Sequence, residues 1–154
     1  MIDLLEELRD ITGAFDQEGI KYALVGGLAY SALVQSRATD DIDLLILPQD
    51  WERIKDLLLR YGYEDLAGPM DFKNIRIRRL VKLEDGESLM VDFLFAENAD
   101  LTAGIEQSIH VGRKGYQYCV APPETIIRLK ELRMSDIDKS DIVGLRKLIE
   151  DQEP

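Results

Sequence analysis

The sequence predicts a mixed α/β (α+β) fold, a mixed β-sheet flanked by helices and followed by a short C-terminal helical tail. Two observations lead to this class. In several segments apolar residues recur at three- and four-residue spacing, which is typical of amphipathic helices. Other segments are short apolar runs bounded by glycine, proline or Asp-Gly, which are typical of strands and tight turns.

Helices and strands are expected to alternate in the first part of the chain. Apolar spacing predicts a helix over residues 2–18, which Gly19 closes. A strand over 22–25 runs into Gly26-Gly27, where a second helix begins and continues to about residue 35. The next expected elements are a strand over 41–47 and a helix over 49–60, opened by Pro48.

The second part contains the clearest hairpin. We expect a loop or short edge strand over 63–72, and then two strands, 74–83 and 88–96, around the tight-turn signal Asp85-Gly86. The remaining expected elements are a helix over 98–109 capped by Asn98, a hairpin over 111–120 about Lys114-Gly115, and helices over 124–133 and 139–149. The chain is interpreted as a single domain, 1–154, with a core of about 20–121 and a tail of 122–154.

Composition excludes several classes of protein. The formal net charge of −11 argues against bulk nucleic-acid binding, which needs a basic face. A single cysteine, Cys119, allows no internal disulfide, zinc-ligand spacing is absent, and the one histidine, His110, gives a His-based triad little to build with. We interpret both residues as structural. With neither a signal-peptide pattern nor a membrane-spanning run, we expect a cytoplasmic protein that does not bind a membrane.

Three carboxylates are the candidate chemical centre. Asp41 and Asp43 lie one residue apart on a predicted strand, so their side chains share a face. Asp92 lies in a second apolar strand, where a lone carboxylate costs several kcal/mol unless a cation or strong donors meet it. If the two strands are neighbours the three acids converge, and such oxygen ligands suit Mg²⁺ together with substrate phosphates.

The paired glycines Gly26 and Gly27 fit the same chemistry. Glycine lets the backbone approach a phosphate closely, and the helix that begins there offers free N–H groups and the positive end of its dipole.

These motifs resemble the nucleotidyltransferase superfamily that includes DNA polymerase beta. The resemblance lies in Gly26-Gly27, a spacer of 13 residues, Asp41-Ile42-Asp43, and Asp92 as the third acid on a later strand. The segment 37–43 is similar to the small prokaryotic branch, which holds antibiotic nucleotidyltransferases, minimal nucleotidyltransferases of toxin–antitoxin pairs and the abortive-infection type. The match is good over about 20–95 and looser in the tail.

The resemblance implies transfer of an NMP group from an NTP to a hydroxyl on a small molecule, a tRNA or a protein, with release of pyrophosphate. ATP is the first candidate for the NTP. Asp41, Asp43 and Asp92 would hold two Mg²⁺ ions, with Mn²⁺ as a substitute, and Asp92 would take the proton of the acceptor. The implied nucleotide contacts are Gly26, Gly27, Arg37, Thr39 and Lys130.

The sequence departs from the family in two ways. Gly-Gly stands where many members have Gly-Ser, so one hydroxyl contact to phosphate is missing. Only about thirty residues follow Pro122. The acceptor site is therefore expected to be open, shared across a homodimer or supplied by a partner protein.

Each feature also has a structural interpretation. The Asp41/Asp43 pair can be a strand-end cap or a solvated edge, and Asp92 can be salt-bridged to an arginine on the adjacent hairpin strand, such as Arg76 or Arg78. The glycine pair can be a simple turn, Arg37 and Thr39 can order a loop, and Lys130 can lie on a helix surface. The basic set is either a solvated strand face or a contact for RNA or a phosphate-bearing acceptor; it comprises Arg76, Arg78, Arg79 and Lys82.

A second functional class stays open beside the enzyme. A degenerate member of the superfamily would keep the fold only for binding, for example as one component of a toxin–antitoxin pair. Retention of all three acids favours the enzyme, because a domain that only binds has no need of them.

Overall fold

A mixed β-sheet of eight strands runs through the computed structural model, which describes residues 2–34, 39–72, 75–113, 115–133 and 136–152. The strand order is β3-β5-β6-β2-β1-β8-β7, and β4 pairs with β5 outside this path. The strands are β1 (Tyr22–Val25), β2 (Asp41–Ile46), β3 (Tyr63–Glu64), β4 (Pro69–Phe72), β5 (Ile75–Glu84), β6 (Glu87–Phe95), β7 (Ile109–Arg113) and β8 (Tyr116–Val120).

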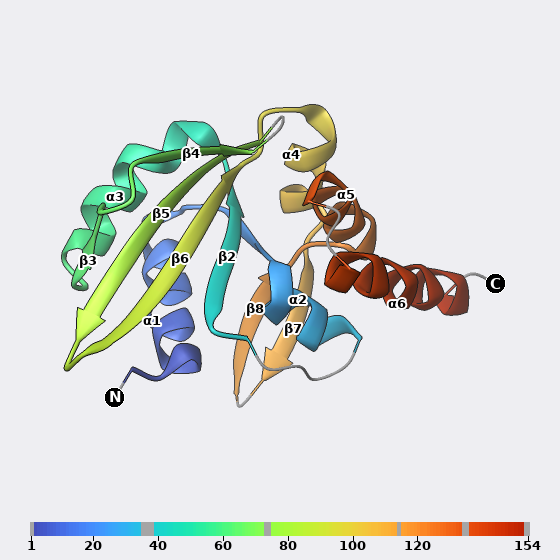
Figure 1. Ribbon diagram of the computed structural model, residues 1–154, viewed down its shortest axis with the longest axis horizontal. Helices are drawn as coiled ribbons and strands as arrows, with labels where there is room; N and C mark the ends of the chain where they lie inside the picture. Colours follow the sequence, from blue (N-terminus) through green and yellow to red (C-terminus); the bar gives the residue numbers. More distant parts are fainter. Residues whose placement is uncertain (1, 35–38, 73–74, 114, 134–135, 153–154) are drawn as a thin grey trace.

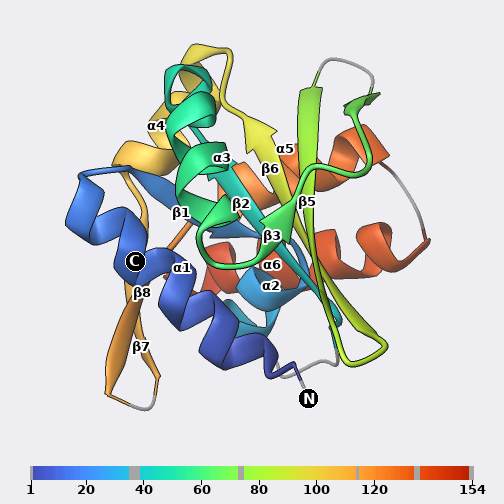
Figure 2. The same cartoon turned by 90° about the vertical axis from the view of Figure 1, so that its left-hand side faces the viewer.

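Helices cover both faces of this sheet (Figures 1 and 2). α1 and α3 lie on one face, and α2, α5 and α6 lie on the other. The helices are α1 (Leu4–Glu18), α2 (Gly26–Leu33), α3 (Trp51–Leu59, after the 3-10 turn Pro48–Asp50), α4 (Ala99–Glu106), α5 (Pro123–Arg133) and α6 (Asp136–Gln152). The predicted α/β class is confirmed.

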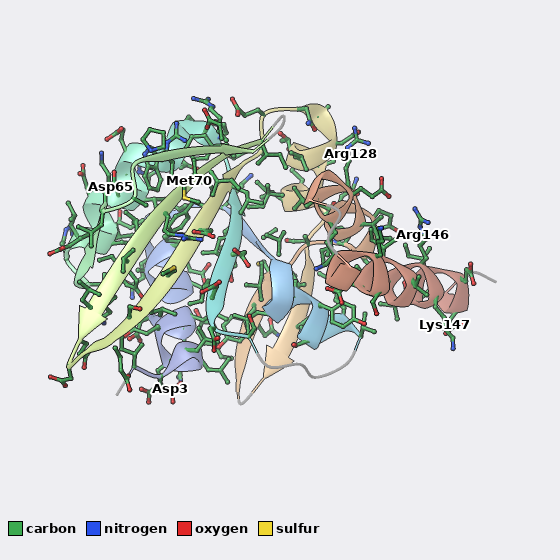
Figure 3. The ribbon with its side chains drawn as sticks, viewed as in Figure 1. Asp3, Asp65, Met70, Arg128, Arg146 and Lys147 are labelled. Carbon is green, nitrogen blue, oxygen red and sulfur yellow. The ribbon has the colours of Figure 1, made fainter. Side chains whose placement is uncertain are left out.

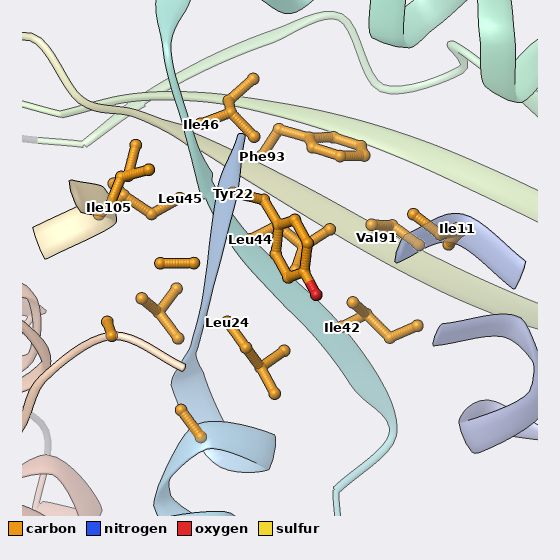
Figure 4. Close-up of a cluster of buried hydrophobic side chains, with 14 of the residues drawn as sticks. Ile11, Tyr22, Leu24, Ile42, Leu44, Leu45, Ile46, Val91, Phe93 and Ile105 are labelled. Carbon is orange, nitrogen blue, oxygen red and sulfur yellow. The ribbon is translucent and has the colours of Figure 1, made fainter. Parts of the chain in front are cut away.

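The central strand β2 divides its side chains between the two faces. Ile42 and Leu44 are fully buried and lie in register with Val91 and Phe93 of β6. Figure 4 shows this cluster, with Ile11 of α1 beside it. The hydrophobic core on the α1/α3 face fixes the strand by burying one set of alternating residues. The other set, which includes the acids, must then face α2, α5 and α6.

Most predicted elements are present with small shifts at their ends. Gly19 closes α1 in the left-handed conformation with φ of 69°, and Asn98 caps α4 by accepting a hydrogen bond from the backbone N–H of Leu101 at 2.9 Å. The segment 63–72 forms two short strands, β3 and β4, which both pair with β5. The last helix is longer than predicted, Asp136–Gln152 against 139–149.

One predicted boundary is wrong. The helix expected over 98–109 ends at Glu106, because Ile109 starts β7 and pairs with Val120 of β8. Pairing within the β7–β8 hairpin here outweighs local helical spacing. Gln35, Asn74 and Lys114, where a helix end, a strand start and a turn were predicted, lie outside the described residues. In the described part of the chain, no helix is both long and apolar enough to cross a membrane.

Candidate active site

The parallel pairing of β2 with β6 brings the predicted acids together. Asp43 is in direct register with Asp92, and Asp41 is in register with Met90. Residues in register on neighbouring strands point to the same face, so Asp43 and Asp92 lie side by side. Asp41 is on that face too, one alternation earlier. Because β2 is flanked by β1 and β6, the alternative of a solvated sheet edge is wrong.

Gly26 lies against the Asp43 carboxylate. Its φ is +71°, and a Cβ built on it would lie 2.1 Å from Oδ2 of Asp43. Only glycine satisfies both the left-handed backbone and this close approach. α2 begins at Gly26, so the positive end of its dipole lies beside the carboxylate. Gly27 follows in the first turn of the helix.

A cavity of about 210 Å³ opens on this face of the sheet, and we call it the central cavity. It lies between β2, β4, β5 and β6 on one side and α5 on the other. The predicted site residues Gly26, Asp43, Asp92 and Lys130 line it. The rest of its lining is Val25, Met70, Ile75, Ile77, Arg79, Leu94, Ile126 and Leu129.

The carboxylate of Asp92 is bound by Arg79, a residue that was not predicted as its partner. Arg79 of β5 donates from Nε to Oδ1 of Asp92 at 2.7 Å and from a terminal nitrogen to Oδ2 at 2.9 Å. The pair is partly buried, with 25% of the arginine side chain and 13% of the aspartate side chain exposed. Both carboxylate oxygens are therefore engaged by one guanidinium group.

The structural interpretation of Asp92, a salt bridge to an arginine of the adjacent hairpin strand, is confirmed, but that arginine is Arg79 and not Arg76 or Arg78. Arg79 is the residue in register with Asp92, whereas Arg76 and Arg78 point to the opposite face, over the ring of Phe95. A signal for this register is present in the sequence. The two turn residues of the hairpin, at positions 85 and 86, both have positive φ, and counting outward from a two-residue turn sets 79 opposite 92.

The predicted basic set on β5 is not one continuous basic surface. Its members are divided between the two faces of the sheet, and each has an acidic partner. The pairs are Arg76 with Glu97, Arg78 with Asp71, Arg79 with Asp92 and Lys82 with Glu7.

Asp41 stands in a different electrostatic environment. Burial raises the pKa of its carboxyl group, the Asp92 carboxylate raises it further, and Arg79 opposes both. With Thr39 and Asp40 it lines a second cavity, at the end of β2 where the strand begins. The structure thus places Thr39 away from the central cavity. Arg37 lies outside the described residues.

Lys130 is buried in the wall formed by α5. Only 4% of its side chain is exposed, and its ammonium group donates to Oδ2 of Asp141 on α6 at 2.8 Å. It also lies 5.9 Å from the centre of the Tyr30 ring on α2. The alternative placement of Lys130 on a helix surface is wrong. The residue instead links three helices beside the cavity that contains Asp43.

The donor set fits a divalent cation only in part. Asp41 and Asp43 supply hard carboxylate oxygens on one face, whereas each oxygen of Asp92 already accepts a hydrogen bond from Arg79. As the side chains lie, no group of three acidic, histidine or cysteine residues is close enough to hold a metal ion in the described segments. His110 of β7 and Cys119 of β8 are in register with each other. β1 and β2 separate these two strands from β6.

The sequence profile of a family described as "Uncharacterised nucleotidyltransferase" matches residues 2–116. The chain belongs to this family. Comparison of the sequence with curated proteins gives no match. The predicted resemblance to nucleotidyltransferases is confirmed.

Solved structures share the fold at low sequence identity. TM1012 of Thermotoga maritima, assigned as a nucleotidyltransferase, gives a TM-score of 0.64 at 16% identity, over 96% of this chain and 93% of that one. The lincosamide antibiotic adenylyltransferase LnuA, solved with lincomycin, gives 0.60 at 17% identity, over 93% and 96%. ANT(2″)-Ia, solved with adenylyl-2″-tobramycin, gives 0.59 at 16% identity, over 96% and 88%.

Replacing Gly26 with alanine should destabilise the protein by more than the backbone conformation alone requires. An alanine at positive φ costs about 1–3 kcal/mol, and at this position its Cβ also displaces the Asp43 carboxylate. Gly19→Ala is the matched control, because Gly19 has φ of +69° and no atom within 4 Å of a built Cβ. In urea unfolding, the free energy of unfolding should therefore be lower for Gly26→Ala than for Gly19→Ala. Equal losses of stability in the two variants would contradict the close contact of Gly26 with Asp43.

The Asp41→Asn variant should melt at a higher temperature than the wild type near pH 7. The raised pKa of Asp41 means that its ionised form is less favourable in the folded protein than in the unfolded chain. The gain in melting temperature should be full above the pKa of Asp41 in the folded protein. It should disappear as the pH falls below the pKa of Asp41 in the unfolded chain, because the carboxyl group is then protonated in both the folded and the unfolded state. Thermal melts from pH 3 to pH 8 measure it. Asp65→Asn, at an exposed site, should show no such gain.

Proposed function

We propose that the protein transfers a nucleoside monophosphate group from an NTP to a hydroxyl group of an acceptor, with pyrophosphate as the leaving group. The observation that carries this proposal is the position of Asp43, which is in register with Asp92 on one side and against Gly26 on the other. The Asp43 carboxylate thus lies between a glycine turn, which is suited to bind phosphates, and Asp92, which is suited to act on the acceptor. The reaction forms an oxygen–phosphorus bond at the α-phosphate and breaks the bond to the pyrophosphate oxygen.

Asp41 and Asp43 would hold Mg²⁺, or Mn²⁺ in its place, with Asp92 joining them once Arg79 is displaced. Divalent cations at such a site neutralise the triphosphate and stabilise the charge that develops on the attacking and leaving oxygens. The match to a nucleotidyltransferase family supports this assignment.

Asp92 is the candidate base for the acceptor hydroxyl. Its carboxylate must first be freed from the two hydrogen bonds of Arg79. The guanidinium group of Arg79 lines the same cavity, so after release it can donate to a phosphate oxygen, which arginine binds well. The ion pair then separates as the substrate phosphates arrive.

The phosphate end of the site is assigned to Gly26, Gly27 and Lys130. The first turn of α2 offers backbone N–H groups and the positive end of a helix dipole. Lys130 lines the cavity, and its ammonium group donates to Asp141 within a buried wall. Arg37 and Thr39 stay predictions as nucleotide contacts. ATP is the proposed donor, because the neighbours LnuA and ANT(2″)-Ia are an adenylyltransferase and a protein solved with an adenylyl product.

Joint binding of Mg²⁺ and ATP is the first test. The wild-type protein should gain thermal stability with both together and little with either alone, because each completes the site of the other. Asp43→Asn should lose this gain and lower pyrophosphate release by about 10²–10³-fold. Asp65→Asn, which changes the same charge at an exposed site, should behave as the wild type. An Asp43→Asn variant with full joint stabilisation would contradict the proposal.

The degenerate binding protein is the competing outcome of the same experiment. A protein that keeps the fold only for binding another protein would show no joint stabilisation with any NTP and no added AMP, CMP or UMP on co-expressed RNA or protein by mass spectrometry.

Removing Arg79 should strengthen metal binding. If its guanidinium group competes with Mg²⁺ for Asp92, Arg79→Gln should bind the ion about three- to tenfold more tightly. The control is Arg78→Gln, which removes the same charge from the other face of β5, where its partner is Asp71. Isothermal titration with Mg²⁺ measures both. An equal gain in the two variants would mean that long-range charge alone is responsible.

A further inference from the structure

We infer that the acceptor is a small, uncharged, hydroxyl-bearing molecule with an apolar body, seated in the half of the central cavity beyond Asp92. This inference rests on the proposed nucleotidyl transfer and specifies its second substrate. The juxtaposition that carries it is a row of apolar side chains directly beside the Arg79–Asp92 pair, covered by apolar residues of α5.

The row spans three neighbouring strands. Met70 of β4 is in register with Ile77 of β5, and Ile77 is in register with Leu94 of β6. Along β5 and β6 these residues lie two positions from Arg79 and Asp92, so they share the face of the ion pair. All three line the central cavity. Figure 3 shows Met70 over the outer strands of the sheet. One end of the cavity therefore has an apolar floor.

α5 forms the opposite wall of the same space. Ile126 and Leu129 line the cavity from this helix, with Ile75 of β5 on the sheet side. Ile126 and Leu129 are themselves buried, 1% and 9% exposed. An occupant between α5 and the sheet would thus be in contact with apolar groups on both sides, which favours removal of apolar surface from water.

The order of the strands assigns this end to the acceptor and not to the triphosphate. Across the sheet, Gly26 follows β1, Asp43 lies on β2 and Asp92 on β6. The phosphates are proposed to lie at the glycine turn, on the β1 side. The apolar row lies on the far side of Asp92. A hydroxyl approaching from there reaches the base first and the α-phosphate from the side away from the leaving group.

The paired charges of the cavity disfavour a polycation. Arg79 is matched by Asp92 and Lys130 by Asp141, and Asp43 is assigned to the phosphate end. The lining therefore offers no surplus of acids at the apolar end, although the whole chain carries a net charge of −11. An ammonium group placed among Ile77, Leu94 and Ile126 would lose its hydration, which is costly, and the nearest acid, Asp92, is already paired with Arg79.

A matched pair of probes tests the inference on the full chain. Cyclohexylmethanol and cyclohexylmethylamine differ only in the hydroxyl or ammonium group. In methyl NMR titrations the alcohol should shift the resonances of Ile75, Ile77, Leu94 and Ile126, and bind at least about fivefold more tightly than the amine. Equal or tighter binding of the amine, or shifts elsewhere only, would overturn the proposed acceptor class.

Variants and a nucleotide analogue locate the probe. Leu94→Ser and Ile77→Ser should weaken binding of the alcohol about tenfold, whereas Leu83→Ser, on an exposed part of β5 (63%), should not. Where a variant fails to fold, the methyl shifts of the wild-type chain decide. The alcohol should also stay bound beside α,β-methylene-ATP and Mg²⁺. Displacement would assign the apolar end to the nucleobase and overturn the inference. No response to the analogue with the alcohol bound would instead count against the proposed transferase alone.

Discussion

The parallel pairing of β2 with β6 is the constraint on which the site depends. Burial of Ile42 and Leu44 against α1 and α3 leaves Asp41 and Asp43 no choice of face. The same register brings Asp92 beside Asp43. A shift of one residue in this pairing would send the third acid to the core side, where an ionised carboxylate is costly. The hydrophobic core therefore decides the geometry of the polar site.

Much of the arrangement could be predicted from the sequence because it follows from alternation and turn chemistry. The order of glycine pair, double acid and later acid predicted which residues meet, and the strand period predicted their common face. The partner of Asp92 required the register of the β5–β6 hairpin. The turn at Asp85-Gly86 contains that information, but local composition alone made Arg76 and Arg78 equally suitable.

Other features depend on packing between distant segments. The burial of Lys130 follows from the approach of α5 to α6 and α2, which bring Asp141 and Tyr30 to it. No local pattern distinguishes this lysine from one on a helix surface. The apolar end of the central cavity is of the same kind, because it combines residues of β4, β5, β6 and α5. The end of α4 at Glu106 has a local cause instead, because β7, which follows it, pairs with the next strand, β8.

The position of α5 has a consequence for the central cavity. The family profile ends at residue 116, whereas α5 begins at Pro123 and supplies Ile126, Leu129 and Lys130 to the cavity wall. The proposed acceptor end therefore draws on both stretches, because its floor of Met70, Ile77 and Leu94 lies within the matched residues and its opposite wall lies after them. Under the proposed function, substitutions at Ile126 or Leu129 would change which acceptor fits while Asp43 and Asp92 stay in place.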